Sequence, residues 1–229
     1  MNRRAPARLG TACAAIAMIT VVGCTAAPPD ASDPSTTTST STEEFVDMFA
    51  GYSQDYEPVA TPAELASQST LVVEGEISTV TDGRTWGSAT DDPGANQSVV
   101  LNVAISEIHV GSAPEGSGDT VYVEVPSPGN VAFDAYASAL PDGLTGVFYL
   151  IPAAMDTTDI LDPDAGRPAG QPLFQMASPQ GLVLGSSDGV LQLIEGDEYP
   201  EADLRDFIPE SERFPVDPDT TPEPDVPAN

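Results

Sequence analysis

The sequence predicts a mainly β domain, built as a small barrel or, alternatively, as a small sandwich, with short helices around it. Three observations carry this prediction. Segments with an apolar residue at every second position recur between Leu71 and Ile194. In two of these segments the alternation changes face part-way along. Turn-forming stretches such as Pro126–Gly129 and Ser186–Gly189 separate the segments.

Two short helices are expected ahead of the β region. Four apolar residues fall on one helical face between Glu43 and Tyr52: Phe45, Met48, Phe49 and Tyr52. Ser41 or Thr42 is placed to cap this helix. A second helix is expected to start at Thr61, because Thr61 and Glu64 have the spacing of a capping box.

Two long strands are expected over Leu71–Val80 and Val99–Val110. Their apolar residues alternate and then change face, at Ile77–Val80 in the first strand and at Ile105–Ile108 in the second. A β-bulge produces such a change, because it adds one residue to a strand and bends it. Two bent strands in succession favour a curled sheet or a barrel over a flat sheet.

The remaining elements are shorter. A third strand at Val121–Val125 precedes about two turns of helix at Phe133–Leu140, and a continuous apolar run at Val147–Ile151 is typical of a buried strand. Three further strands are expected at Leu173–Met176, Leu182–Leu184 and Val190–Ile194, the last two forming a hairpin around Ser186–Gly189.

This order of elements over Leu71–Ile194 resembles an OB-type barrel with an added hairpin. The resemblance rests on three strands, a helix and two strands in succession, and on no diagnostic motif. It implies a five-stranded Greek-key barrel with its helix between the third and fourth strands.

The N-terminus has the pattern of a secretory signal. Arg3, Arg4 and Arg8 precede an uncharged apolar stretch from Leu9 to Val22. This stretch is shorter than the roughly 20 apolar residues that a membrane-spanning helix needs. An uncleaved anchor helix is the alternative interpretation.

Val21-Val22-Gly23-Cys24 resembles the lipobox of bacterial lipoproteins. The resemblance implies that a signal peptide of residues 1–23 is removed. It also implies that Cys24 carries a diacylglyceryl group, which holds the protein on the extracytoplasmic face of the cell membrane. The composition, rich in Ala, Gly, Pro and Asp with no lysine, is similar to that of lipoproteins from high-GC Gram-positive bacteria.

The rest of the chain divides by composition. Residues 24–42 contain the lipidated cysteine and a Ser/Thr/Pro stretch expected to be a disordered tether. Residues 43–70 form the helical lead-in and residues 71–194 the barrel-like domain. Residues 195–229 are acidic and Pro-rich, and we expect a largely disordered tail, in which Tyr199–Phe214 has enough apolar residues to pack on the barrel.

Charge and cysteine content exclude several functions. The chain has a net charge of −29, and beyond Cys24 four arginines against 36 acidic residues give 4 − 36 = −32. Such a surface repels phosphate backbones, so no nucleic-acid partner is expected, and it favours a monomer. Cys13 falls in the signal and Cys24 takes the lipid, which leaves no thiol for catalysis or disulfides.

His109 is the single histidine and therefore the single histidine base available to a serine nucleophile. The nearby Ser106 and Ser112 are not in a Gly-x-Ser-x-Gly turn, so a surface histidine is the favoured interpretation. We expect no catalytic, cofactor-binding or metal-binding residue and no cofactor.

One acidic loop is a candidate calcium site. It contains Asp156, Asp159, Asp162 and Asp164 with Gly166. These are hard oxygen ligands, but their spacing departs from the EF-hand, and a solvated loop is the favoured interpretation.

The function favoured by these patterns is a non-catalytic binding module of the cell envelope, with a protein, peptide or wall glycan as partner. The barrel loops Thr81–Gln97 and Met155–Gln171 would form the binding surface, with Trp86 as its anchor. The alternative is an envelope hydrolase that uses carboxylates or His109.

Overall fold

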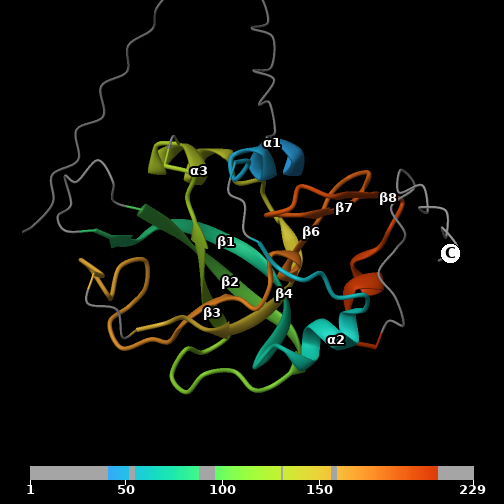
Figure 1. Cartoon of the computed structure of the whole chain (residues 1–229), viewed down its shortest axis with the longest axis horizontal. Helices are drawn as coiled ribbons and strands as arrows, with labels where there is room; N and C mark the ends of the chain where they lie inside the picture. The colour runs from blue at the N-terminus through green and yellow to red at the C-terminus, as the bar shows by residue number, and fades with distance from the viewer. Residues whose placement is uncertain (1–40, 52–54, 88–95, 130, 156–158, 211–229) are drawn as a thin grey trace, which may run out of the picture. The chain divides into compact units, whose positions relative to one another are not determined.

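Five strands close into a barrel (Figure 1). A computed structural model describes residues 41–51, 55–87, 96–129, 131–155 and 159–210. The barrel strands are β1 (Leu71–Trp86), β2 (Asn96–Val110), β3 (Thr120–Pro126), β4 (Thr145–Pro152) and β5 (Leu173–Met176).

The strand order is β1-β2-β3-β5-β4, and β1 pairs with β4 to close the ring. The β3–β5 pairing is parallel, whereas the other pairings of the ring are antiparallel. Helix α3 (Phe133–Ala139) connects β3 to β4. The mainly β prediction is confirmed, and the closed ring matches the expected OB-type barrel rather than the sandwich.

A second group of strands extends the sheet beyond the barrel. β6 (Leu182–Gly185), β7 (Gly189–Gln192) and β8 (Glu198–Pro200) follow one another as antiparallel neighbours. Strand β4 serves both parts, because residues 150–152 pair with β5 and residues 146–148 pair with β6. The expected hairpin is confirmed, with Ser186 N donating to Gly189 O across its turn at 2.8 Å.

The bulges predicted from the changes of face are present in β1 and β2. The β1–β2 register skips Ser78 on one strand and Ser106 on the other. Each serine hydroxyl donates to a carbonyl oxygen of the facing strand, Ser78 to Asn102 at 2.9 Å and Ser106 to Glu74 at 3.0 Å. These bulges bend the long strands enough for the sheet to close.

Two glycines face each other across the closing β1–β4 pair, and each lets its strand approach the strand on its other side closely. Gly75 of β1 lies opposite Gly146 of β4. A Cβ atom on Gly75 would lie 2.5 Å from Ala104 O, and one on Gly146 would lie 2.5 Å from Val183 O. A side chain at either position would therefore clash with the backbone of a neighbouring strand.

Helices α1 (Thr42–Asp47) and α3 lie side by side at one end of the barrel (Figure 1). Three fully buried aromatic rings reach the barrel core here: Phe45 from α1, Phe49 from the turn after α1, and Tyr136 from α3. The Phe49 ring lies 5.5 Å from Phe45 and 5.0 Å from Tyr136, centroid to centroid.

Helix α1 begins at the expected cap but ends earlier than the sequence predicts. Ser41 and Glu44 form a capping box, and the α-helical residues stop at Asp47, before a turn. The expected tether of residues 24–42 therefore ends two residues too late, because Ser41 is the N-cap of this helix and Thr42 is its first residue. Residues 1–40, with the lipobox, lie outside the described residues.

Helix α2 (Pro62–Ser67) packs outside the barrel, where Leu65 meets Val72, Val147 and Tyr149. Its cap Thr61 accepts from Glu64 N, as expected, but the Glu64 carboxylate accepts from Ala60 N. None of the helices formed by the described residues is long and apolar enough to cross a membrane.

The domain extends past the expected boundary at Ile194. Strand β8 and the 3-10 helix η2 (Leu204–Phe207) belong to the folded part, and Tyr199 and Phe207 are buried against Val183 and Val190. The expectation of a largely disordered tail from residue 195 is therefore wrong for residues 195–210. The apolar outer face of β6–β7 needs this cover, because it would otherwise be exposed to water.

Candidate functional site

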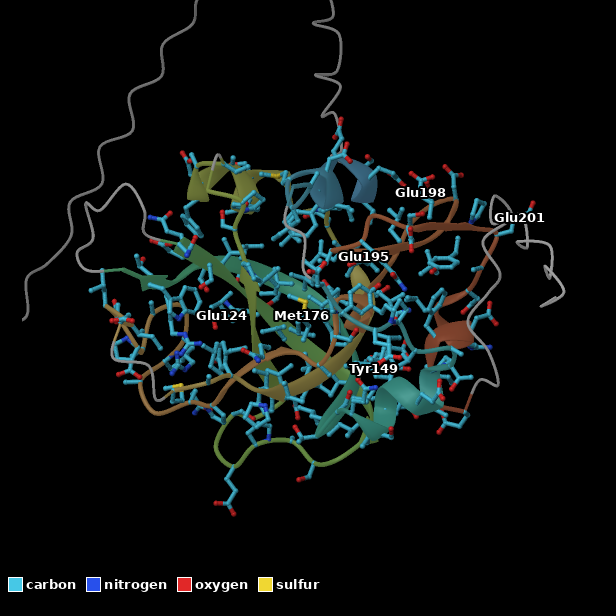
Figure 2. The ribbon with its side chains drawn as sticks, viewed as in Figure 1. Glu124, Tyr149, Met176, Glu195, Glu198 and Glu201 are labelled. Atoms are coloured by element: carbon cyan, nitrogen blue, oxygen red, sulfur yellow. The ribbon has the colours of Figure 1, made fainter. Side chains whose placement is uncertain are left out.

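A pocket of about 590 Å³ opens where β3 and β5 reach the end of their pairing. Figure 2 labels two of its residues, Glu124 of β3 and Met176 of β5. Its wall combines one indole ring with several amide, hydroxyl and carboxylate groups. The lining residues are Tyr56, Glu57, Gln68, Trp86, Glu124, Pro126, Ile151, Gln175, Met176, Ala177, Ser178 and Pro179.

The carboxylate of a buried ion pair lines this pocket. Arg84 and Glu124 are 1% and 4% exposed, and the Arg84 guanidinium donates to both carboxylate oxygens through Nε and Nη2. Ser98 Oγ donates to Glu124 at 2.9 Å, and Arg84 Nη1 donates to Ala154 O at 2.7 Å. Both charges are therefore saturated with partners, as buried charges must be.

The sequence explains how Arg84 reaches Glu124. Between Asp82 and Thr85 the β1–β2 register shifts, so Gly83 and Arg84 face Ser98 together. A Cβ atom on Gly83 would lie 2.4 Å from Ser98 Oγ, which shows how closely the strands approach here. This irregularity turns the Arg84 side chain across β2 toward β3.

Trp86 lies beside this ion pair and not in a loop. Strand β1 continues to Trp86, and the Arg84 guanidinium carbon lies 5.1 Å from the centre of the indole ring. Ile160 forms a β-bridge to Trp86, while Leu161 N donates to Thr85 O at 2.9 Å. The expected loop from Thr81 to Gln97 is thus wrong at both ends, since β1 ends at Trp86 and β2 begins at Asn96.

The described part of the loop between β4 and β5 packs onto the barrel instead of projecting outward. Gly166 O accepts from Thr81 Oγ at 2.8 Å, and Gln171 Nε2 donates to Gly116 O at 3.0 Å. An apolar cluster lies on the same outer face: Val100, Ala153, Leu173 and Tyr122. The face of the second and third strands, which binds ligands in many OB-type barrels, is covered here by the chain itself.

The described aspartates of the acidic loop do not converge on one another. Asp164 pairs with Arg167 at 3.6 Å, and the backbone oxygen of Asp159 accepts from Gly87 N. Among described residues, Asp159, Asp162 and Asp164 do not form a group of converging ligands. Asp156 lies outside the described residues.

His109 lies on β2, away from the residues that line the pocket. No hydrogen bond joins it to Ser106 or Ser112 among the described residues, and Ser106 Oγ is engaged with Glu74 O. A general base must lie within hydrogen-bond reach of its nucleophile. The arrangement therefore does not support a serine–histidine pair.

The pocket also contains a tyrosine that resists ionisation. Burial, together with the negative charges of Glu195 and Asp197 and a hydrogen bond with Glu195, raises the pKa of Tyr56 to about 12. Burial, followed by Asp197, raises the pKa of the Glu195 carboxyl above its usual range, although its hydrogen bond with Tyr56 opposes this shift. Tyr56 is thus held as a neutral hydrogen-bond donor at the pocket rim.

We expect the Tyr56 hydroxyl to ionise near pH 12 instead of its ordinary value of 10.0. Because folding raises this pKa, the stabilising contribution is complete below pH 10 and is lost as the pH rises toward 12. Alkaline titration followed by tyrosinate absorbance, in the protein and in Tyr56→Phe, isolates this group by difference. A difference curve with its midpoint near 10 would contradict the expectation.

Comparison of the chain with protein-family models, with curated proteins and with solved structures returned no match.

Proposed function

We propose that this protein is an extracytoplasmic lipoprotein anchored through Cys24, and that its barrel domain is a non-catalytic module that binds a neutral glycan of the cell envelope. The pocket beside Trp86 is the proposed binding site. The chemistry of its lining is the observation that carries the proposal.

The anchor is inferred from the lipobox-like Val21-Val22-Gly23-Cys24. A diacylglyceryl group has two acyl chains, which suffice for stable membrane attachment where a single chain is marginal. Because α1 is capped by Ser41, residues 24–40 separate the lipid from the domain. A Cys24→Ala variant should lose incorporation of labelled fatty acid and leave the membrane fraction. An unchanged membrane fraction would contradict the anchor.

The pocket favours a neutral, hydroxyl-rich ligand. An indole ring offers a flat apolar surface for a sugar ring, and Trp86 is placed at the pocket wall. The amides of Gln68 and Gln175 can donate to and accept from hydroxyl groups. Glu57 and the strong negative charge of the chain oppose phosphate or other anionic ligands.

Ligand binding can be followed through the fluorescence of Trp86, because it is the only tryptophan in the chain. We expect short N-acetylglucosamine oligomers to change this fluorescence in a saturable way. Gln175→Ala should weaken binding by about 1–3 kcal/mol, because a ligand hydroxyl then loses its partner. Gln97→Ala removes an exposed glutamine that does not line the pocket and is the matched control.

Two outcomes would contradict the glycan proposal. One is a fluorescence that does not change with neutral oligosaccharides at millimolar concentration. The other is equal binding by the Gln175 and Gln97 variants. The hydrolase alternative has weaker support among the described residues. Of the two glutamates that line the pocket, Glu124 is saturated by Arg84 and Ser98, so the lining does not offer a pair of unengaged carboxylates.

A further inference from the structure

Three potential metal ligands converge on the outer side of the β1–β2 pair, outside the pocket. Glu74, Glu107 and His109 each offer one ligand atom, and these atoms all lie within 4.8 Å of one another. None of the three lines the proposed glycan pocket. The cluster is therefore independent of the proposed function.

The bulges of β2 explain why these side chains meet. Glu74 pairs directly with Glu107, so both carboxylates stand on the same side of the sheet. The register skips Ser106 before Glu107 and skips His109 after Ile108. The second bulge frees the backbone of His109 from regular pairing and places its ring next to the two carboxylates.

The surroundings of His109 point to a ligand independently of the two carboxylates. Its side chain is 7% exposed, and its buried Nε2 atom has no hydrogen-bond partner. The nearest acidic atom, Oε2 of Glu74, lies 3.8 Å away, which is too far for a hydrogen bond. A buried ring nitrogen without a partner is unusual in folded proteins, and this one is directed at two carboxylates.

The spacing suits an ion placed between the ligands. Two ligand atoms that each lie about 2.05 Å from a tetrahedral zinc ion are roughly 3.3 Å apart. The 3.8 Å between Nε2 and Oε2 is close to this separation, so small side-chain rotations would close the site. The Glu74 side chain is 36% exposed and Glu107 is exposed, which leaves room for a water ligand.

We propose that Glu74, Glu107 and His109 bind a first-row divalent transition-metal ion such as Zn²⁺. One imidazole and two carboxylates form a ligand set typical of such ions, whereas Mg²⁺ and Ca²⁺ prefer oxygen ligands alone. The ion would join the Nε2 atom to the carboxylates and remove the repulsion between two glutamates that face each other across the strands.

Zinc binding can be read at the only histidine of the chain. We expect saturating Zn²⁺, added to the full chain in detergent, to shift the ring ¹⁵N resonance of Nε2, the nitrogen that binds the metal. Zinc held only by other acidic residues would leave the ring resonances unchanged. Unchanged ring resonances at saturation would overturn the proposal.

Matched substitutions then test the carboxylates. Glu107→Gln should weaken zinc binding at the histidine at least about tenfold, since loss of even an indirect partner of a metal ligand costs 10–100-fold. Glu76→Gln changes the next exposed glutamate on β1, which is outside the cluster, and should bind as the unaltered chain does. Equal weakening by the two variants, with unchanged circular dichroism, would overturn the proposal.

Discussion

Replacing Glu124 with glutamine is expected to lower the free energy of unfolding by about 3–5 kcal/mol. The substitution keeps the shape of the side chain but removes its charge, so the Arg84 guanidinium stays buried without a counter-ion. Arg84 is only 1% exposed and cannot turn to water without disrupting the strands around it. Denaturant unfolding of the two chains gives the difference directly.

Two control variants test whether the loss of stability in Glu124→Gln comes from the burial of the Arg84 charge. Glu76→Gln removes a carboxylate that is exposed on β1, and it should change stability by less than about 0.5 kcal/mol. The double variant Arg84→Met with Glu124→Leu should recover most of the loss, because apolar replacement of a buried pair is often neutral. Equal effects of Glu124→Gln and Glu76→Gln would contradict the burial argument.

Replacing Phe49 with alanine is expected to cost about 3–5 kcal/mol, the range for a fully buried phenylalanine. The Phe49 ring packs between Phe45, in an edge-to-face contact, and Tyr136, and so links the turn after α1 to α3 at the end of the barrel. Its removal would leave a cavity that two short helices cannot fill by small movements. Thermal unfolding by circular dichroism measures the loss.

A double-mutant cycle with Tyr136→Ala tests whether the rings act together. We expect a coupling energy of about 0.5–1.5 kcal/mol, as measured for aromatic pairs. Phe133→Ala, which removes a partly buried ring at the start of α3, should cost less. A Phe49→Ala loss no larger than that of Phe133→Ala would show that α1 does not close the barrel.

Much of the barrel could be predicted from local patterns. Alternation located the strands, and the changes of face near Ser78 and Ser106 located two bulges correctly. Side-chain caps at Ser41 and Thr61 located two helix starts. These features depend on residues close together in the chain, and their physical causes are therefore visible in short windows of sequence.

The candidate sites were harder to predict. The second half of β1 has polar residues and a glycine, a composition that predicts a loop containing Trp86. Its pairing with β2 holds this half in the sheet although its residues form only a weak strand pattern. The apolar residues between Tyr199 and Phe207 predict packing on the barrel, whereas the acidic, Pro-rich composition around them predicts disorder.

The sequence alone determined the absence of lysine and the strong negative charge, and it predicted the order of the strands, while the secretory, lipobox-like start stays a prediction. Only the tertiary structure brought Arg84 to Glu124, which lies 40 residues further along, and His109 to Glu74. The physical reason is barrel closure. Strand pairing and bulges decide which side chains from distant segments share a face, and no local pattern contains that information.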